Sequence, residues 1–333
     1  MDNKILFLTD VNKQIGTGHL MRSIRMGKEL FKFTNNISII LKTKKKINTK
    51  ELFKKKYYLN NYAEIFNLIK KIKPKLLIID LPKYNLKFEK KLFINNIKFL
   101  IYDRFLRKKI YSNFLINLNP KIKKEDYKNK LITKTRLFLG PKYFPINSKI
   151  YKKKNSIEIK NVLIFLGGGE INYILINKIF NVLVRSRIKD CNIFFITMNK
   201  INRIKIKKYK NRYNLKLNFI NNTDNIYNYI RKSDLSIISS GSISFESCFF
   251  NVPMILLSVA QNQVGIAKSW NNFEAGYYIG NHVNKNFEIK LNNSINDLSS
   301  FTNRNKMINK QKKFFNNKFN YRSDFINNFK YDF

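Results

Sequence analysis

The sequence is poor in cysteine, in acidic residues and in long apolar runs. Its 2 cysteines, Cys191 and Cys248, lie in apolar stretches without the spacing of a zinc site or a redox pair. This excludes a disulfide scaffold and favours a reducing compartment. The longest later apolar run, from about Val252 to Ala260, contains Pro253 and is far shorter than the roughly 20 residues of a membrane span. The N-terminal apolar run is too short for a signal peptide. We therefore expect a soluble, cytoplasmic protein.

Acidic residues are scarce beside basic ones: 21 Asp and Glu stand against 65 Lys and Arg, which gives a formal charge of +44. A charge of this size suggests binding to the phosphates of a nucleic acid. The lysines, however, are spread in short runs, and asparagine, isoleucine, phenylalanine and tyrosine are abundant too, as AT-rich coding would produce. Arginine, the better reader of bases, is rare. We therefore expect no specific nucleic-acid partner, with a basic nucleic-acid-binding protein as a remote alternative.

The chain has 333 residues, 44% of them hydrophobic, which is enough for two domains with separate cores. Short β-like runs that end in small or acidic residues alternate with helical patterns, which is typical of an open parallel α/β sheet. The predicted strands are 5–9, 37–41, 76–80, 99–103, 162–166, 192–197, 217–220, 235–239 and 254–258. A polar, lysine-rich passage at 147–160 is the predicted linker. We expect a Rossmann-like domain at 1–147, a second at 148–300 and a basic, aromatic-containing helical tail at 301–333.

A glycine–histidine loop follows the first predicted strand, with the sequence Gln14-Ile-Gly-Thr-Gly-His-Leu-Met-Arg22. Gly16 and Gly18 allow a ligand to approach the backbone, and the helix that follows presents free N–H groups to a negative charge. Position 21 carries Met where a dinucleotide fingerprint needs its third glycine, so a nicotinamide site is not expected. His19 opens the helix, where the helix dipole favours the neutral, basic ring. It is a candidate catalytic base or, alternatively, a helix cap.

Two further loops lie in the second half, each after a predicted strand. Gly167-Gly-Gly-Glu170 is a ligand loop or a tight turn. Ser239-Ser-Gly-Ser-Ile-Ser-Phe-Glu246 opens a helix whose amides and hydroxyls suit a diphosphate without a metal ion or a lysine. Glu246 is placed to accept hydrogen bonds from a ribose diol. The sequence holds only 2 histidines and dispersed acids, so we expect no metal site and no cofactor.

In this order the motifs resemble those of the UDP-sugar hydrolases of pseudaminic acid biosynthesis, which act on UDP-2,4-diacetamido-2,4,6-trideoxy-β-L-altropyranose. The resemblance runs from about residue 4 to residue 280. Besides the three loops it includes Asp10, Leu139-Gly-Pro-Lys-Tyr143, Phe165-Leu166, Asn262-Gln263, Trp270 and Gly276. The chain departs from the family at Asp80, which is followed by Leu81-Pro82 where the family tends to have x-Tyr, and at Glu170, where the family has Asp.

The resemblance implies a GT-B fold: two Rossmann-like, doubly wound parallel-sheet domains that face a cleft, with UDP held mainly by the second. It implies that His19 is the general base for water, that Asn262 contacts the substrate and that Glu246 contacts the ribose. The other residues assigned to substrate binding are Gly16, Gly18, Arg22, Gly167, Gly168, Ser240, Gly241 and Ser242.

The expected activity is metal-independent hydrolysis of a UDP-linked 2,4-diacetamido-2,4,6-trideoxyhexose to free sugar and UDP by a monomer. UDP leaves as an already anionic phosphate, so the reaction needs no general acid, and one base suffices. Water attacks either the anomeric carbon, with inversion, or the phosphorus, with retention. Transfer to another acceptor, as in nucleotide-sugar glycosyltransferases of the spore-coat polysaccharide type, is the alternative function.

Overall fold

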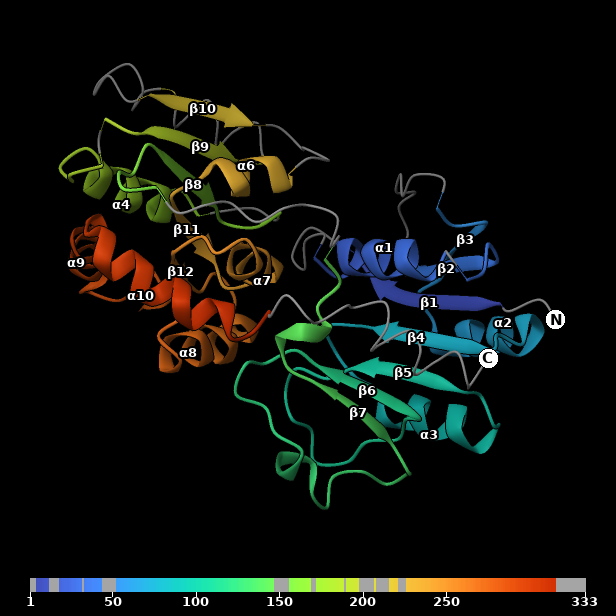
Figure 1. Cartoon of the computed structure of the whole chain (residues 1–333). Helices are drawn as coiled ribbons and strands as arrows, with labels where there is room; N and C mark the ends of the chain where they lie inside the picture. Colours follow the sequence, from blue (N-terminus) through green and yellow to red (C-terminus); the bar gives the residue numbers. More distant parts are fainter. Residues whose placement is uncertain are drawn as a thin grey trace. The chain divides into compact units, whose positions relative to one another are not determined.

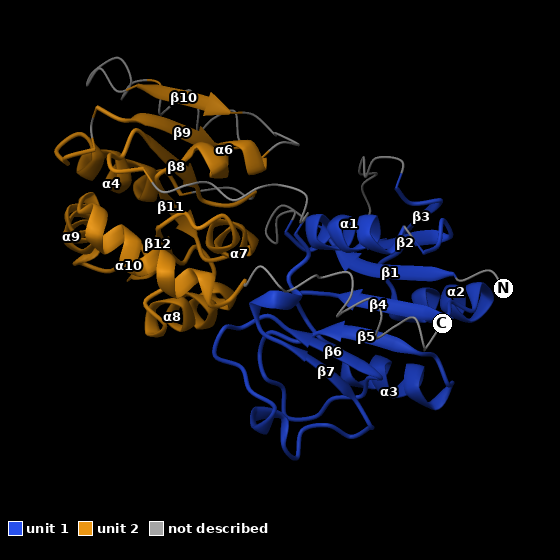
Figure 2. Ribbon diagram, viewed as in Figure 1, with its two compact units in different colours: residues 1–148, 318–333 blue, residues 149–317 orange. Residues whose placement is uncertain are grey.

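The computed structural model of the chain describes residues 4–11, 18–31, 33–43, 52–146, 156–168, 172–188, 190–197, 207, 216–220 and 226–315. These residues form two compact units. Unit 1 contains the described residues up to 146, and unit 2 contains those from 156 to 315 (Figure 2). Each unit is built on its own parallel β-sheet.

Unit 1 is organised around a seven-stranded sheet in the order β3-β2-β1-β4-β5-β6-β7, in which all neighbouring strands run parallel (Figure 1). The strands are β1 (Ile5–Asp10), β2 (Ile37–Lys42), β3 (Lys55–Tyr58), β4 (Leu76–Asp80), β5 (Phe99–Tyr102), β6 (Phe114–Asn117) and β7 (Arg136–Leu139). The helical elements are α1 (Gly18–Leu30), α2 (Tyr62–Ile72), α3 (Leu86–Ile94), η1 (Glu125–Tyr127) and η2 (Pro141–Tyr143).

The two faces of β1 pack against different parts of unit 1. Leu6 and Leu8 belong to the buried core that α2 and α3 share with the sheet. Phe7 lies on the other face, where its ring meets Phe53 edge-on at 5.8 Å between centroids. Side chains alternate along a strand, so Thr9 lies on the same face as Phe7. Asp80, the last residue of β4, pairs with Thr9, so its side chain also lies on this second face, which α1 covers.

Unit 2 repeats the plan with a six-stranded parallel sheet in the order β10-β9-β8-β11-β12-β13. The strands are β8 (Asn161–Phe165), β9 (Asn192–Ile196), β10 (Leu217–Ile220), β11 (Leu235–Ser239), β12 (Met254–Leu257) and β13 (Tyr277–Gly280). The helical elements are α4 (Tyr173–Leu183), α6 (Ile226–Lys232), α7 (Ser242–Phe249), η3 (Gln261–Gln263), α8 (Val264–Asn272), α9 (Phe287–Ser299) and α10 (Phe301–Lys312). Within the described ranges, none of the helices combines the length and the apolar character needed to cross a bilayer.

Each of the nine predicted strands overlaps an observed one, because each is an apolar run that the sheet buries. The analysis of the sequence missed β3, β6, β7 and β13. Three of these lie at sheet edges, where polar residues and partial exposure blur the pattern. β6 is fully buried but only four residues long, which is short for a periodicity argument.

Helix α10, the last described helix of unit 2, packs on α7 and α9. Its Arg304 is fully buried and donates from Nη1 to the carbonyls of Leu298 and Ser299, at 2.8 and 2.9 Å. Nη2 donates to the carbonyls of Ser156, at 3.0 Å, and Ile157. Residues 301–312, expected as part of a helical tail, form a helix with one face buried against unit 2. Residues 316–333 of that expected tail lie outside the described residues.

Candidate functional site

In each sheet the order in which the chain adds strands reverses once, at a switch point. The candidate residues follow the strands that flank this point. In unit 1 the chain proceeds outward from β1 to β3 and then returns to β4 on the other side of β1. In unit 2 the same reversal lies between β8 and β11. In open α/β sheets, ligands bind at the carboxyl ends of the strands at such a switch point. His19 follows β1, and the glycine and serine loops follow β8 and β11, so all three motifs occupy this position in their own unit.

The unit 1 site is a buried cluster of charged side chains around Asp80, the last residue of β4. Nδ1 of His19 lies 2.7 Å from Oδ1 of Asp80. Nε of Arg22 donates to Oδ2 of the same carboxylate at 2.6 Å, and Nη2 donates to Oδ1. His19 and Arg22 are three residues apart on α1, so they face the carboxylate together. The Arg22 guanidinium also lies 4.5 Å from the ring centroid of Tyr102, at the end of β5.

Arg104 contributes a second guanidinium from the loop after β5. Its Nη2 lies 2.9 Å from Nε2 and 3.0 Å from Nδ1 of His19, and 3.6 Å from Oδ1 of Asp80. The lone pair of Nε2 lies in the ring plane and points away from Nδ1. A donor in line with it would be much closer to Nε2 than to Nδ1, so Arg104 lies across the imidazole ring. Arg104 therefore makes no aligned hydrogen bond to Nε2, and the lone pair of Nε2 stays available to another group.

Burial and the neighbouring charges fix the protonation of this cluster. Burial, which alone raises the pKa of Asp80, is outweighed by the Arg22 guanidinium and by His19, so that this pKa lies far below its usual range. The pKa of His19 is lowered, chiefly by burial; Asp80 opposes this effect, and Arg104 adds to it. An ionised carboxylate can only accept hydrogen bonds, so Nδ1 of His19 is the donor and Nε2 is unprotonated. The cluster therefore presents a neutral, oriented imidazole near pH 7.

The structure places the other predicted residues of unit 1 as follows. Gly18 is the first residue of α1 and is exposed, and Arg22 lies one turn further along α1. Gly16 lies outside the described residues. The sequence analysis did not assign Asp80 or Arg104 to the site. The available signal was an aspartate at the end of a strand that neighbours β1, and it could have identified Asp80.

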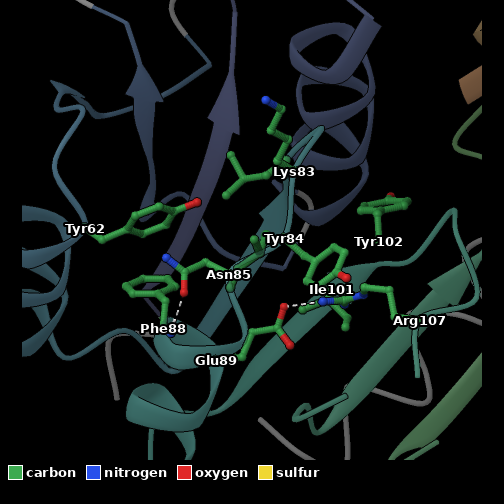
Figure 3. A pocket seen from close by; sticks show the side chains of 11 residues that line it. Tyr62, Lys83, Tyr84, Asn85, Phe88, Glu89, Ile101, Tyr102 and Arg107 are labelled. Atoms are coloured by element: carbon green, nitrogen blue, oxygen red, sulfur yellow. Dashed lines mark hydrogen bonds and ion pairs between the residues drawn. The ribbon is translucent and has the colours of Figure 1, made fainter. Parts of the chain in front are cut away.

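A shallow pocket lies beside this cluster, at the carboxyl ends of β4 and β5 (Figure 3). Aromatic rings line it, among them Tyr62 and Tyr84, together with the buried ion pair of Glu89 and Arg107. Burial raises the pKa of Glu89, against the effect of Arg107. Tyr102 lines the pocket and also stacks on Arg22, so the pocket and the histidine cluster share one residue.

The unit 2 site is formed by the loops after β8 and β11. Gly167 has φ +107°, a conformation that favours glycine, and a Cβ there would lie 3.8 Å from Oγ of Ser239. The glycine loop and the serine loop are thus side by side. Gly241 is the N-cap residue of α7, and Ser242 is its first residue; both are half-buried. The first N–H groups of α7 and its dipole make this end of the helix suitable for an anion.

Three further residues predicted to bind the substrate from unit 2 differ in their burial and contacts. The hydroxyl of Ser240 is fully buried and donates to the carbonyl of Leu257 at 3.0 Å, so it supports the loop from within. Glu246 is only 1% exposed, and its contact with a ribose stays a prediction. Asn262 is half-buried in η3, whose Gln263 amide nitrogen lies 3.8 Å from the Cβ position of Gly241.

The remaining predicted residue, Gly168, follows Gly167 and is half-buried, and Gly169 and Glu170 lie outside the described residues. Trp270, the only tryptophan of the chain, donates from Nε1 to Oγ of Ser244 at 3.1 Å. Ser244 lies in the first turn of α7, so the indole reports on this loop. In the described parts of both units, no group of three or more His, Cys, Asp or Glu side chains is placed to hold a metal ion.

The chain is distantly related to proteins of several organisms. It is 28% identical over 274 residues to an uncharacterized protein of Methanocaldococcus jannaschii, over 76% of this chain and 55% of that protein. It is 26% identical over 271 residues to the UDP-2,4-diacetamido-2,4,6-trideoxy-beta-L-altropyranose hydrolase of Campylobacter jejuni, over 79% of this chain and 94% of that enzyme. The spore coat polysaccharide biosynthesis protein SpsG of Bacillus subtilis is 23% identical over 154 residues, 44% of either chain. The chain thus spans about half the length of the Methanocaldococcus relative and somewhat less of SpsG.

A sequence profile of the lipid-A-disaccharide synthetase family, LpxB, matches residues 143–268. Among solved structures, MurG of Acinetobacter baumannii matches with a TM-score of 0.68 and 12% identity, over 98% of this chain and 99% of that one. A UGT transferase from Siraitia grosvenorii in complex with UDP matches with a TM-score of 0.64 and 9% identity, over 98% and 99%. At these identities the likeness concerns the fold. The two parallel-sheet units of this chain form a GT-B fold.

Proposed function

We propose that the chain is an enzyme acting on a nucleotide sugar, and specifically a hydrolase that releases UDP from a UDP-linked 2,4-diacetamido-2,4,6-trideoxyhexose. The observation that carries the proposal is the neutral, oriented His19 at the switch point of the first sheet, with its Nδ1 on Asp80 and its Nε2 unprotonated. The relation to the Campylobacter hydrolase, which extends over 94% of that enzyme, supports this substrate class.

In the proposed reaction a water molecule attacks the anomeric carbon while Nε2 of His19 takes one of its protons. A bond forms between the water oxygen and the anomeric carbon, and the bond from that carbon to the UDP oxygen breaks. UDP leaves with the electron pair as an anion and needs no proton. Asp80 keeps the ring in the reactive tautomer and stabilises the imidazolium that forms.

In the same proposal, unit 2 holds UDP. The Gly167–Gly168 loop and the amides at the start of α7, around Gly241 and Ser242, bind the diphosphate without a metal ion. Asn262 contacts the substrate from η3. Glu246, in the same helix α7, contacts the ribose in this proposal.

A glycosyltransferase is the second candidate. The GT-B fold shared with MurG and with a UGT transferase, and the partial likeness to SpsG, favour it. In a transferase His19 would take the proton from an acceptor hydroxyl instead of from water. The two candidates therefore use the same base and differ in the nucleophile.

The test is incubation of the protein with a panel of UDP-sugars, including the UDP-linked 2,4-diacetamido-2,4,6-trideoxyhexose, with UDP and free sugar followed by NMR. The hydrolase proposal expects stoichiometric UDP and free sugar from water alone, and a rate of UDP release that is greatly reduced in H19N. In ¹⁸O-labelled water, label in the sugar indicates attack at carbon and label in UDP indicates attack at phosphorus. UDP binding without turnover, followed by turnover only when a sugar or lipid acceptor is added, would replace the hydrolase with the transferase.

A further inference from the structure

Arg104 is a half-buried cation that shares its carboxylate with another arginine. Asp80 is the acid with the largest effect on Arg104, and both of its oxygens already accept hydrogen bonds from Arg22. One of these oxygens also accepts from His19 and lies 3.6 Å from Arg104, beyond hydrogen-bond distance. Two guanidinium groups thus share one carboxylate, and the cluster holds one uncompensated positive charge. Burial and the Arg22 charge lower the pKa of Arg104 to about 10, which leaves it charged near pH 7.

A surplus cation that is largely withdrawn from water destabilises a protein unless an anion joins it. The site is at the carboxyl end of β4 and beside the start of α1, whose dipole attracts negative charge as well. Planar guanidinium groups bind phosphoryl oxygens in pairs of parallel hydrogen bonds. We infer that Arg104 is the phosphate-binding residue of unit 1, and that it exchanges its contact with His19 for the phosphoryl oxygens of a nucleoside diphosphate when that ligand binds.

This exchange matters for the base because Arg104 opposes protonation of His19. The charged groups that act on His19 are Asp80 from β4, Arg22 from α1 and Arg104 from the loop after β5. A proton on Nε2 would place a third positive charge beside one carboxylate while Arg104 lies across the ring. A diphosphate that draws Arg104 away and adds negative charge lets His19 accept the proton. On the proposed function, on which this inference rests, the base thus becomes competent only when substrate is bound.

The first experiment compares the affinities of UDP and of uridine for the wild-type chain, R104A and R104K. Arg104→Ala is expected to weaken UDP binding about 10- to 100-fold, as for the loss of a charge-assisted hydrogen bond, and to leave uridine binding unchanged. R104K keeps the charge but not the planar fork, so it is expected to lie between the two. R136A is the matched control, because Arg136 is an exposed arginine of the same unit, at the edge strand β7.

Thermal unfolding separates a ligand-binding role from a structural one. Because Arg104 is a surplus cation in the folded chain, R104A is expected to unfold at the same temperature as the wild type or higher. A structural arginine would give the opposite result. If R104A does not fold, R104K serves for the binding comparison.

The second experiment follows the titration of the His19 ring by NMR. The chain has only 2 histidines, so the signal that disappears in H282Q belongs to His282 and the other to His19. In the free protein, R104A is expected to raise the pKa of His19 by about 1 pH unit. Saturation of the wild type with UDP is expected to raise it likewise. Equal losses of UDP and uridine affinity in R104A, or a His19 titration that UDP leaves unchanged, would overturn the inference.

The outcomes for the proposed function are distinct. If no UDP-sugar is turned over, but UDP and inorganic pyrophosphate still bind in a manner that depends on Arg104, the hydrolase proposal fails and the phosphate site stands. If UDP-sugars are hydrolysed and R104A keeps both the rate and the UDP affinity of the wild type, the hydrolase stands and the phosphate site fails.

Discussion

Nδ1 of His19 and Oδ1 of Asp80 lie 2.7 Å apart, although 61 positions of the sequence separate the two residues. The parallel pairing of β1 with β4 makes this contact possible, because it sets Thr9, one position before the end of β1, opposite Asp80. Oγ1 of Thr9 also donates to the carbonyl of Asp80 at 3.2 Å. The position of the base is therefore fixed by the sheet rather than by the glycine–histidine loop alone.

Replacement of His19 by Asn is expected to reduce the rate of UDP release about 10²- to 10⁴-fold, because the group that takes the proton is lost. UDP affinity is expected to stay within about twofold, since the proposal assigns most of UDP binding to unit 2. Trp270 fluorescence, which reports on the α7 loop, measures that affinity. Equal loss of rate and UDP affinity would instead identify His19 as a structural residue.

Replacement of Asp80 by Asn is expected to affect both activity and stability. The rate is expected to fall about 10²- to 10⁴-fold because an amide favours the wrong tautomer of His19. The free energy of unfolding is expected to fall by about 3 kcal/mol or more, since Arg22 loses its buried partner. Urea unfolding of wild type and D80N at pH 7 gives this difference.

The pH dependence of the D80N effect follows from the direction of the Asp80 shift. Its pKa is lower in the folded chain than in the unfolded one, so it stabilises the fold above about pH 4, and this stabilisation is lost as the pH falls through the folded pKa. The gap in unfolding free energy between wild type and D80N is expected to be constant from pH 8 to about 5 and to narrow only below about pH 4. A gap that closes near pH 6 would mean that the carboxylate is not held by Arg22 and His19.

Acid is expected to inactivate the free enzyme only below about pH 6.5, the ordinary pKa of histidine. The base must be neutral, and burial and Arg104 lower the pKa of His19, so the neutral form persists to lower pH. The acid limb of kcat/KM against pH measures this value, and H282Q is expected to leave the limb in place. An acid limb well above pH 6.5 would contradict the assignment of His19.

Removal of divalent metal ions is expected to leave the rate nearly unchanged. In the proposal the diphosphate is held by backbone amides of unit 2 without a metal ion, and the described residues offer no cluster of three metal ligands. Excess EDTA in the UDP-sugar assay, followed by added Mg²⁺ or Mn²⁺, is the measurement. A strict requirement for either ion would favour another type of nucleotide-sugar transferase.

Binding to duplex DNA or RNA is expected to be weak, independent of sequence and abolished by modest salt, because a diffuse positive charge acts through counterion release. UDP affinity is expected to persist much better, since it depends on fixed dipoles of a site as well as on long-range charge. The measurement is the affinity of one protein preparation for a labelled oligonucleotide and for UDP, each titrated against salt concentration. Tight oligonucleotide binding near physiological salt, without UDP binding, would contradict the enzyme proposal and favour a nucleic-acid-binding protein.

Local patterns predicted the strands of both sheets well, because burial on both faces of a parallel sheet produces apolar runs that are visible in the sequence. They also placed His19, Gly167 and Gly241 after the right strands. Asp80 was missed as the partner of His19 because strand order, not sequence spacing, brings the two together. Glu246 was placed by its distance from the helix start; its burial could not be predicted in this way, because burial depends on how α7 packs on the sheet.

Arg304 gives unit 2 a mechanical property. One guanidinium is bonded both to the carbonyls of Ser156 and Ile157, just before the first strand of the unit, and to the carbonyls at the end of α9. Tension applied to the chain just before β8 therefore meets this clasp before it reaches the sheet. Because the clasp ties that segment to the junction of α9 and α10, the two helices share the load with β8.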